Sequence, residues 1–185
     1  MGAAEALFLE NGVQPTTIEQ IASRAGVAKG TFYLYYSSKE DIHAALGDRF
    51  GVRYLQALTV AVARRPSRDF SGRLEAWSKA AVNGFIEDKD LVNMLFHTHP
   101  RPPDGSPNPI VENLAALLKE GVAGGHCTVE DPSSAALFVF GGLHALVDDY
   151  LLGRKRLSRA QLLRRIQEFC FAAIGLSFPE RQPTT

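Results

Sequence analysis

Apolar residues recur along this chain at intervals of three and four, the spacing that places side chains on one face of an α-helix. No run shows the convincing apolar–polar alternation of a half-buried strand. The pattern predicts helices over residues 2–11, 17–25, 29–34, 38–62, 70–87, 89–98, 109–123, 132–152 and 158–176. A proline-rich loop is expected from Pro100 to Pro109, whose last residue opens the next helix. The predicted fold class is therefore all-α.

Polar residues at the predicted helix starts supply capping signals. Thr16 followed by Glu19 reads as a capping box, with Thr16 as the N-cap of the second helix. Ser38 is placed to cap the fourth helix, and Asn108 precedes a proline at the first helical position. Gly12 is expected to end the first helix.

The second and third predicted helices are short, and a glycine-containing turn at Gly26 joins them. That arrangement is a helix-turn-helix. We expect its small core to consist of Ile18, Ile21, Ala22, Val27 and Phe32. The third helix then points Lys29, Gly30, Thr31, Tyr33 and Leu34 outward, with Tyr35 and Lys39 beside them, whereas Tyr36 joins the core.

This outward set suits a DNA duplex. Lysines and tyrosine hydroxyls pair with phosphates, and a bare glycine lets the backbone approach the strand. Thr31 and Leu34 are placed to touch base edges, Leu34 at a thymine methyl. The backbone N–H groups at Thr16 and Thr17 are a further candidate for a phosphate.

The first fifty residues resemble the DNA-binding domain of the tetracycline-repressor (TetR) family. The matching positions are Leu7-Phe8, Gly12, Thr16-Thr17-Ile18, Ile21-Ala22, Ala25-Gly26-Val27, Lys29-Gly30-Thr31-Phe32-Tyr33, Tyr36 and Ser38-Lys39-Glu40. The resemblance implies a homodimer on a palindromic operator in double-stranded DNA. By position it implies phosphate contacts at Thr17, Lys29, Tyr33, Tyr35 and Lys39, and base reading at Ala28, Gly30, Thr31 and Leu34.

Two features depart from that family. The first helix begins part-way into the family's longer one, without basic residues ahead of it. Residues 1–50 carry four basic side chains against six acidic ones, a balance of −2. Either the natural N-terminus is missing from this sequence, or affinity for DNA depends on few contacts.

The remaining helices predict a second domain, so we expect residues 1–48 to bind DNA and residues 49–180 to bind a ligand and dimerise. The last two predicted helices each carry an apolar face, and the two faces together are the predicted dimer interface. The alternative is that these faces pack within one subunit. The residues of the two faces are Ala135, Phe138, Val139, Gly142, Leu143, Ala145, Leu146 and Asp149 on the first helix and Leu162, Leu163, Ile166, Phe169, Cys170, Ala173 and Ile174 on the second. Candidates to line a pocket for a small hydrophobic effector, each otherwise an ordinary core residue, are Trp77, Phe85, Met94, Phe96, His97, Leu117, Phe140 and His144.

Charge and cysteine content add little to this interpretation. Twenty basic residues balance twenty acidic ones, so any nucleic-acid site must be local. Cys127 and Cys170 are predicted to be buried thiols, and no segment reads as a signal peptide or membrane span, so a cytoplasmic protein is expected. His97 and His99 lack a third ligand nearby in sequence, so neither a metal nor a cofactor is predicted.

Two other classes of function compete with this interpretation. No phosphate loop, nucleophile elbow or Cys/His cluster supports an enzyme. The acidic N-terminal segment leaves open a helical dimeric interaction protein that has lost DNA binding. Together, the sequence predicts a transcriptional repressor that a small hydrophobic ligand releases from its operator.

Overall fold

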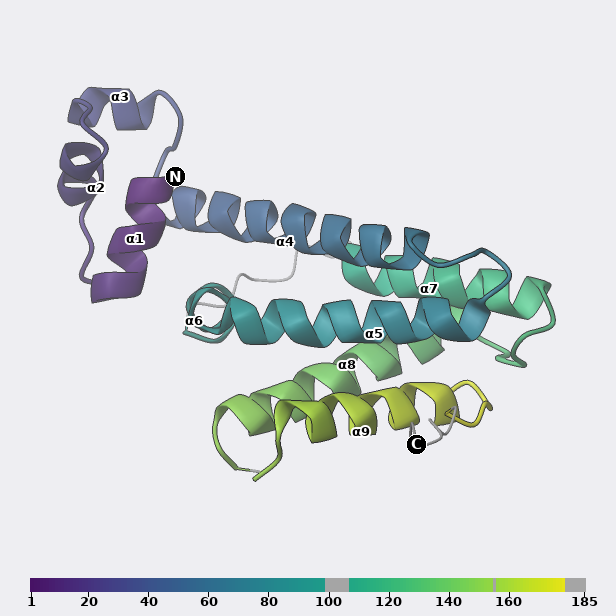
Figure 1. Cartoon of the computed structure of the whole chain (residues 1–185). Coiled ribbons are helices and arrows are strands. Elements are labelled where there is room, and N and C mark those ends of the chain that lie inside the picture. The colour runs from purple at the N-terminus through teal and green to yellow at the C-terminus, as the bar shows by residue number, and fades with distance from the viewer. Residues whose placement is uncertain (99–106, 155, 179–185) are drawn as a thin grey trace. The chain divides into compact units, whose positions relative to one another are not determined.

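The computed structural model describes residues 1–98, 107–154 and 156–178, without the side chains of residues 97 and 98. Those residues form helices and connecting turns and no strand, so the all-α prediction is confirmed. In chain order the elements are α1 (Gly2–Asn11), α2 (Ile18–Arg24), α3 (Lys29–Tyr33), α4 (Lys39–Ala63), α5 (Phe70–Glu87), α6 (Lys89–Val92), the π-helix η1 (Asn93–Thr98), α7 (Pro109–Ala123), α8 (Pro132–Leu151) and α9 (Arg159–Ala172) (Figure 1).

The chain divides into two compact units. The first comprises Met1–Arg53 and Asp88–Ser106, and the second comprises Tyr54–Glu87 and Pro107–Thr185. Helix α4 therefore contributes its first part to one unit and its last turns to the other. This grouping describes compactness, and the predicted division of function between residues 1–48 and 49–180 stays a prediction.

The core of the first unit is formed by apolar side chains from α1, α2, α3 and the first part of α4. The side chains that close its core are Ala4, Leu7 and Phe8 of α1, Ile21 and Ala22 of α2, Phe32 of α3, and Ile42, Leu46 and Phe50 of α4. Helix α1 packs on α2, and α2 packs on α3 (Figure 1). Isolated helices of this length are marginal in water, so this shared core is what keeps them folded.

Residues 88–98, which follow α5 in sequence, belong to the first unit. Leu91, Val92, Met94 and Leu95 are buried there. The ring of His43 on α4 lies 3.4 Å, through Nε2, from the carbonyl oxygen of Met94. Phe50 and Phe96 meet edge to face with 5.7 Å between ring centroids. Helix η1 is thereby anchored to α4.

The second unit is a helical layer structure in which α7 packs on α8, α8 on α9, and α9 on α5. The indole of Trp77 is fully buried on α5, and its Nε1 donates to Oδ1 of Asn113 on α7 at 2.9 Å. Asn108 caps α7 ahead of Pro109, as predicted, by accepting from the backbone N–H of Ile110. The predicted bounds of α5 agree with the structure at both ends.

One close approach within the second unit depends on a glycine. The ring of Tyr54 on α4 lies against Gly84 on α5, where a Cβ would stand 2.5 Å from Cε2 of the ring. The Tyr54 hydroxyl donates to the carbonyl oxygen of Ala81 at 2.9 Å. Burial raises the pKa of this phenol far above its ordinary value. Gly84 therefore allows a tyrosine to be fully packed and still hydrogen-bonded.

Two further predictions concern buried chemistry and membranes. Cys127 and Cys170 are free, buried thiols, as expected, and burial raises the pKa of both, that of Cys170 to about 12. Among the described residues, no helix is both long and apolar enough to cross a bilayer. Those residues also contain no cluster of three or more potential metal ligands.

Candidate nucleic-acid interface

The second helix is capped one residue later than the sequence pattern predicts. Thr17, not Thr16, is the N-cap: its hydroxyl accepts from the backbone N–H of Gln20 at 3.2 Å. The side chain of Gln20 completes the capping box by accepting from the backbone N–H of Thr17 at 2.8 Å. The box therefore satisfies two of the backbone donors at this helix start, which leaves fewer of them for a phosphate than predicted.

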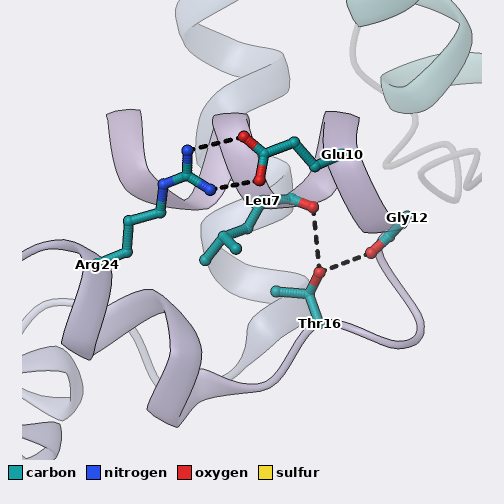
Figure 2. Close-up of polar contacts among 5 residues, drawn as sticks. All are labelled: Leu7, Glu10, Gly12, Thr16 and Arg24. Atoms are coloured by element: carbon teal, nitrogen blue, oxygen red, sulfur yellow. Dashed lines mark hydrogen bonds and ion pairs between the residues drawn. The ribbon is translucent and has the colours of Figure 1, made fainter.

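Thr16 has a different role, which the sequence pattern did not reveal. Its side chain is buried, and its hydroxyl lies 2.7 Å from the carbonyl oxygen of Gly12 and 3.4 Å from that of Leu7 (Figure 2). It thus fastens the segment before α2 to the end of α1. Beside it, the guanidinium of Arg24 on α2 faces the carboxylate of Glu10 on α1 (Figure 2).

The corner between α2 and α3 turns at Gly26, whose φ of 70° lies in the left-handed region that glycine adopts without strain. The backbone N–H of Val27 donates back to Ala22 at 3.0 Å, which closes the turn. Val27 was predicted to be in the core, but its side chain is 42% exposed. The prediction was wrong because the turn directs this residue outward. Ala25, the C-cap of α2, is also exposed.

The segment that begins with α3 presents a mostly uncharged, largely aromatic surface. Phe32 is buried and holds Tyr33 edge to face at 5.5 Å between ring centroids. Tyr33 is 50% exposed, Leu34 80% and Tyr35 76%. Tyr36 is half-buried against Phe32, which agrees in part with its predicted core position. Ala28, Gly30 and Lys29 are exposed, and Thr31 is half-buried.

The basic residues of this region are paired with acidic ones. Lys29 forms an ion pair with Glu19 of α2, which raises the pKa of the lysine and lowers that of the carboxyl. Arg24 and Glu10 shift one another's pKa in the same way. Lys39 instead donates from Nζ to the carbonyl oxygen of Gln14 at 2.7 Å. Both lysines predicted to meet phosphates therefore already have partners in the free protein.

The sequence pattern does not reveal Glu19 as a neighbour of Lys29. It predicts a capping-box role for Glu19, which Gln20 fills in the structure. The two charges are ten residues apart in sequence and lie on different helices, so helical periodicity alone does not pair them. Only the crossing of α2 and α3 at the corner reveals the contact.

The predicted dimer faces are split between core and surface. Six of the residues named for the interface are instead buried within the subunit: Val139, Leu143, Leu162, Ile166, Cys170 and Ile174. Phe138 and Phe169 remain exposed, at 74% and 41%, and Leu137, which was not predicted, is 60% exposed. The alternative of packing within one subunit therefore holds for the buried six, whereas the exposed face of α8 carries Leu137 beside the predicted Phe138.

The predicted effector-binding residues are divided between the two units. Phe85, Phe140 and His144 do meet: the rings of Phe85 and His144 are 4.7 Å apart between centroids, and Phe140 packs against both. Trp77 and Leu117 are buried in the same unit, whereas Met94 and Phe96 belong to the first unit. The side chain of His97 and the whole of His99 lie outside the described residues.

Comparison with known proteins agrees with this geometry. Residues 1–46 match the family model "Bacterial regulatory proteins, tetR family". The uncharacterised HTH-type transcriptional regulator YerO of Bacillus subtilis is 53% identical over 95 residues, which span 49% of this chain and 31% of that protein. The chain spans less than two thirds of the length of each curated relative that it matches.

Solved structures share the fold along most of the chain. The fatty acid degradation regulator FadR from Bacillus halodurans superposes with a TM-score of 0.72 at 22% identity, covering 91% of each chain. A TetR-like transcriptional regulator from Rhodococcus sp. RHA1 superposes with a TM-score of 0.66 at 21% identity, covering 94% of this chain and 92% of that one. At this level of identity the likeness concerns the fold.

Proposed function

We propose that this chain, whose residues 1–46 match the family model for tetR regulatory proteins, is a repressor that binds a palindromic operator as a homodimer and leaves it on binding a small hydrophobic ligand. Its relatives and structural neighbours are transcription regulators and not enzymes. The observation that supports DNA binding most directly is the exposed segment after the Gly26 corner, where Leu34 and Tyr35 are among the most exposed large apolar side chains described.

The proposed DNA contacts are those that the family resemblance implies by position, and several of them are exposed. Tyr33 and Tyr35 are exposed aromatic residues whose hydroxyls suit phosphate oxygens. The proposed phosphate contacts are Thr17, Lys29, Tyr33, Tyr35 and Lys39, and the proposed base-reading positions are Ala28, Gly30, Thr31 and Leu34. Lys29 would have to exchange its carboxylate partner for a phosphate, a substitution that keeps its charge neutralised.

The proposed homodimer uses the outer face of α8 and α9. Leu137 and Phe138 leave a large apolar surface exposed on α8, and Phe169 adds to it from α9. Gly141 and Ala145, on the same helix, are small and exposed, which permits close approach of a second helix. Burying a side chain such as Phe138 contributes about 1.5–3 kcal/mol, so a symmetric face of this composition favours association.

The proposed effector site is the aromatic group of Phe85, Phe140 and His144. Phe85 is buried, whereas Phe140 and His144 are half-buried, so a ligand could contact the last two from solvent. Trp77 lies on the same helix as Phe85, and its fluorescence is the natural probe of ligand binding in this unit. An effector that releases DNA without altering that fluorescence would place the ligand site elsewhere.

Selection of duplexes from a random pool by the purified full chain tests the function. Enrichment of a palindrome with half-sites about 34–36 Å apart, or a multiple of that spacing, is expected for a dimeric reader of successive major grooves. Phe138→Glu should yield a monomer in sedimentation and abolish that enrichment. A variant that stays dimeric would remove α8 from the interface. A chain that enriches no duplex would instead be the helical interaction protein considered above.

A further inference from the structure

The most exposed large apolar side chain in the segment after α3 is Leu34, at 80%. Leaving a leucine in water forgoes most of its burial energy, and nothing within the described part of this unit covers it. The following inference rests on the proposed function, because it concerns what Leu34 contacts when the segment enters a DNA groove.

The side chains of the segment exclude most kinds of base readout. Bidentate recognition of guanine or adenine in the major groove uses arginine, lysine, asparagine or glutamine, and a carboxylate accepts from cytosine. Residues 28–36 contain none of these except Lys29, and the single hydroxyl of Thr31 cannot bond in a bidentate way. The proposed function assigns Lys29 to a phosphate, so its charge is not available to a base. Bidentate hydrogen bonding to a base is therefore not available to this segment.

An apolar contact remains available, and the geometry favours it. Thr31 and Leu34 are three residues apart in helical conformation and so lie on one face, since Leu34 itself has φ −73° and ψ −21°. A Cβ at Gly30 would meet no atom within 4 Å, so the backbone there is open to close approach. The uncovered backbone at Gly30, next to the Leu34 side chain and the Thr31 methyl, suits contact with a small apolar group on a base edge.

We propose that Leu34, flanked by Gly30 and Thr31, reads the 5-methyl group of thymine. That methyl is the apolar group that the four bases present at the major-groove edge. The specificity of this protein then depends on where thymines stand in each half-site, with little contribution from hydrogen bonds to bases. Lys29, Tyr33 and Tyr35 supply affinity through phosphates, and Leu34 supplies sequence preference.

The test replaces single thymines by deoxyuridine in the duplex that the full chain selects. This substitution removes the methyl and keeps the base-pairing groups. At the contacted position, affinity of the wild-type chain should fall about fourfold, which corresponds to about 0.8 kcal/mol for one buried methyl. Leu34→Ala should bind the thymine duplex more weakly and should not respond to deoxyuridine at that position. Leu152→Ala, another exposed leucine, serves as the matched control.

Each outcome decides the inference. Loss of the deoxyuridine effect in Leu34→Ala alone, with Leu152→Ala behaving as wild type, supports it. An equal effect in wild type and Leu34→Ala overturns it, because another group then senses the methyl. Insensitivity of the wild-type chain to every deoxyuridine also overturns it while leaving DNA binding intact. A chain that selects no duplex overturns the proposed function and this inference with it.

Discussion

The contact between Tyr54 and Gly84 predicts opposite effects for two glycine-to-alanine changes. Gly84→Ala places a methyl 2.5 Å and 2.7 Å from ring carbons of Tyr54, a residue that is 5% exposed and cannot swing into solvent. Overpacking of this kind costs about 1–3 kcal/mol. A displaced ring also endangers the hydrogen bond to Ala81, which adds about 1 kcal/mol. Alanine's better helix propensity returns about 1 kcal/mol. The expected net loss is about 1–3 kcal/mol.

Gly51→Ala, on α4, is the matched control. Its Cβ would meet nothing within 4 Å, so only the propensity gain of about 0.5–1 kcal/mol remains. Urea unfolding followed by the fluorescence of Trp77, the chain's one tryptophan, measures the change near Gly84, and backbone circular dichroism reports both variants. The penalty of Gly84→Ala should shrink strongly on a Tyr54→Ala background. A neutral Gly84→Ala, or an undiminished penalty without the ring, would refute the reasoning.

Three further outcomes are expected. Thr17→Ala removes the N-cap of α2 and should lower the free energy of unfolding by about 0.5–2 kcal/mol. Thr16→Val keeps that cap and should instead speed hydrogen exchange where α1 meets α2. Equal exchange patterns in the two variants would contradict the separate roles. Burial raises the pKa of Cys170 from 9.0 to about 12, so its thiol is neutral in the folded protein. The stability that this group contributes is complete below pH 9 and falls between pH 9 and 12, where the thiol ionises in the unfolded chain first. The free energy of unfolding of Cys170→Ala should lack this fall with pH. Because the proposed phosphate contact requires Lys29 to leave Glu19 on DNA, Glu19→Gln should tighten DNA binding without adding a phosphate contact, so the slope of log affinity against log salt should stay nearly unchanged. A slope steeper by about one in Glu19→Gln would contradict this, because it would mean that the pair persists on DNA in the wild-type chain.

Helix positions were predictable because they depend on local patterns. The apolar spacing from Phe70 to Glu87 placed α5, and Asn108 with Pro109 placed the start of α7. The cap of α2 was not decidable in this way. Thr16 with Glu19 and Thr17 with Gln20 both fit a capping box, and the choice depends on Thr16 being buried against the end of α1.

Features that depend on packing between distant segments were beyond the sequence pattern. Helix α8 is apolar around most of its circumference, so periodicity alone does not tell that Val139 faces the core and Phe138 faces outward. Likewise, Met94 and Phe96 have the composition of a ligand pocket, but their segment folds back onto α4 in the first unit. Such choices are made by the tertiary fold and not by local propensity.

The paired charges of the first unit have a consequence for how fast an operator is found. Residues 1–50 carry a balance of −2, and Arg24, Lys29 and Arg49 each face a carboxylate. A surface of this kind offers little long-range attraction to a polyanion, so association should run near the unsteered 10⁵–10⁶ per molar per second. Weak non-specific binding to DNA also shortens the distance that the protein slides along the duplex before it dissociates. The search should therefore proceed mainly by repeated three-dimensional encounters, and its rate should depend only weakly on ionic strength.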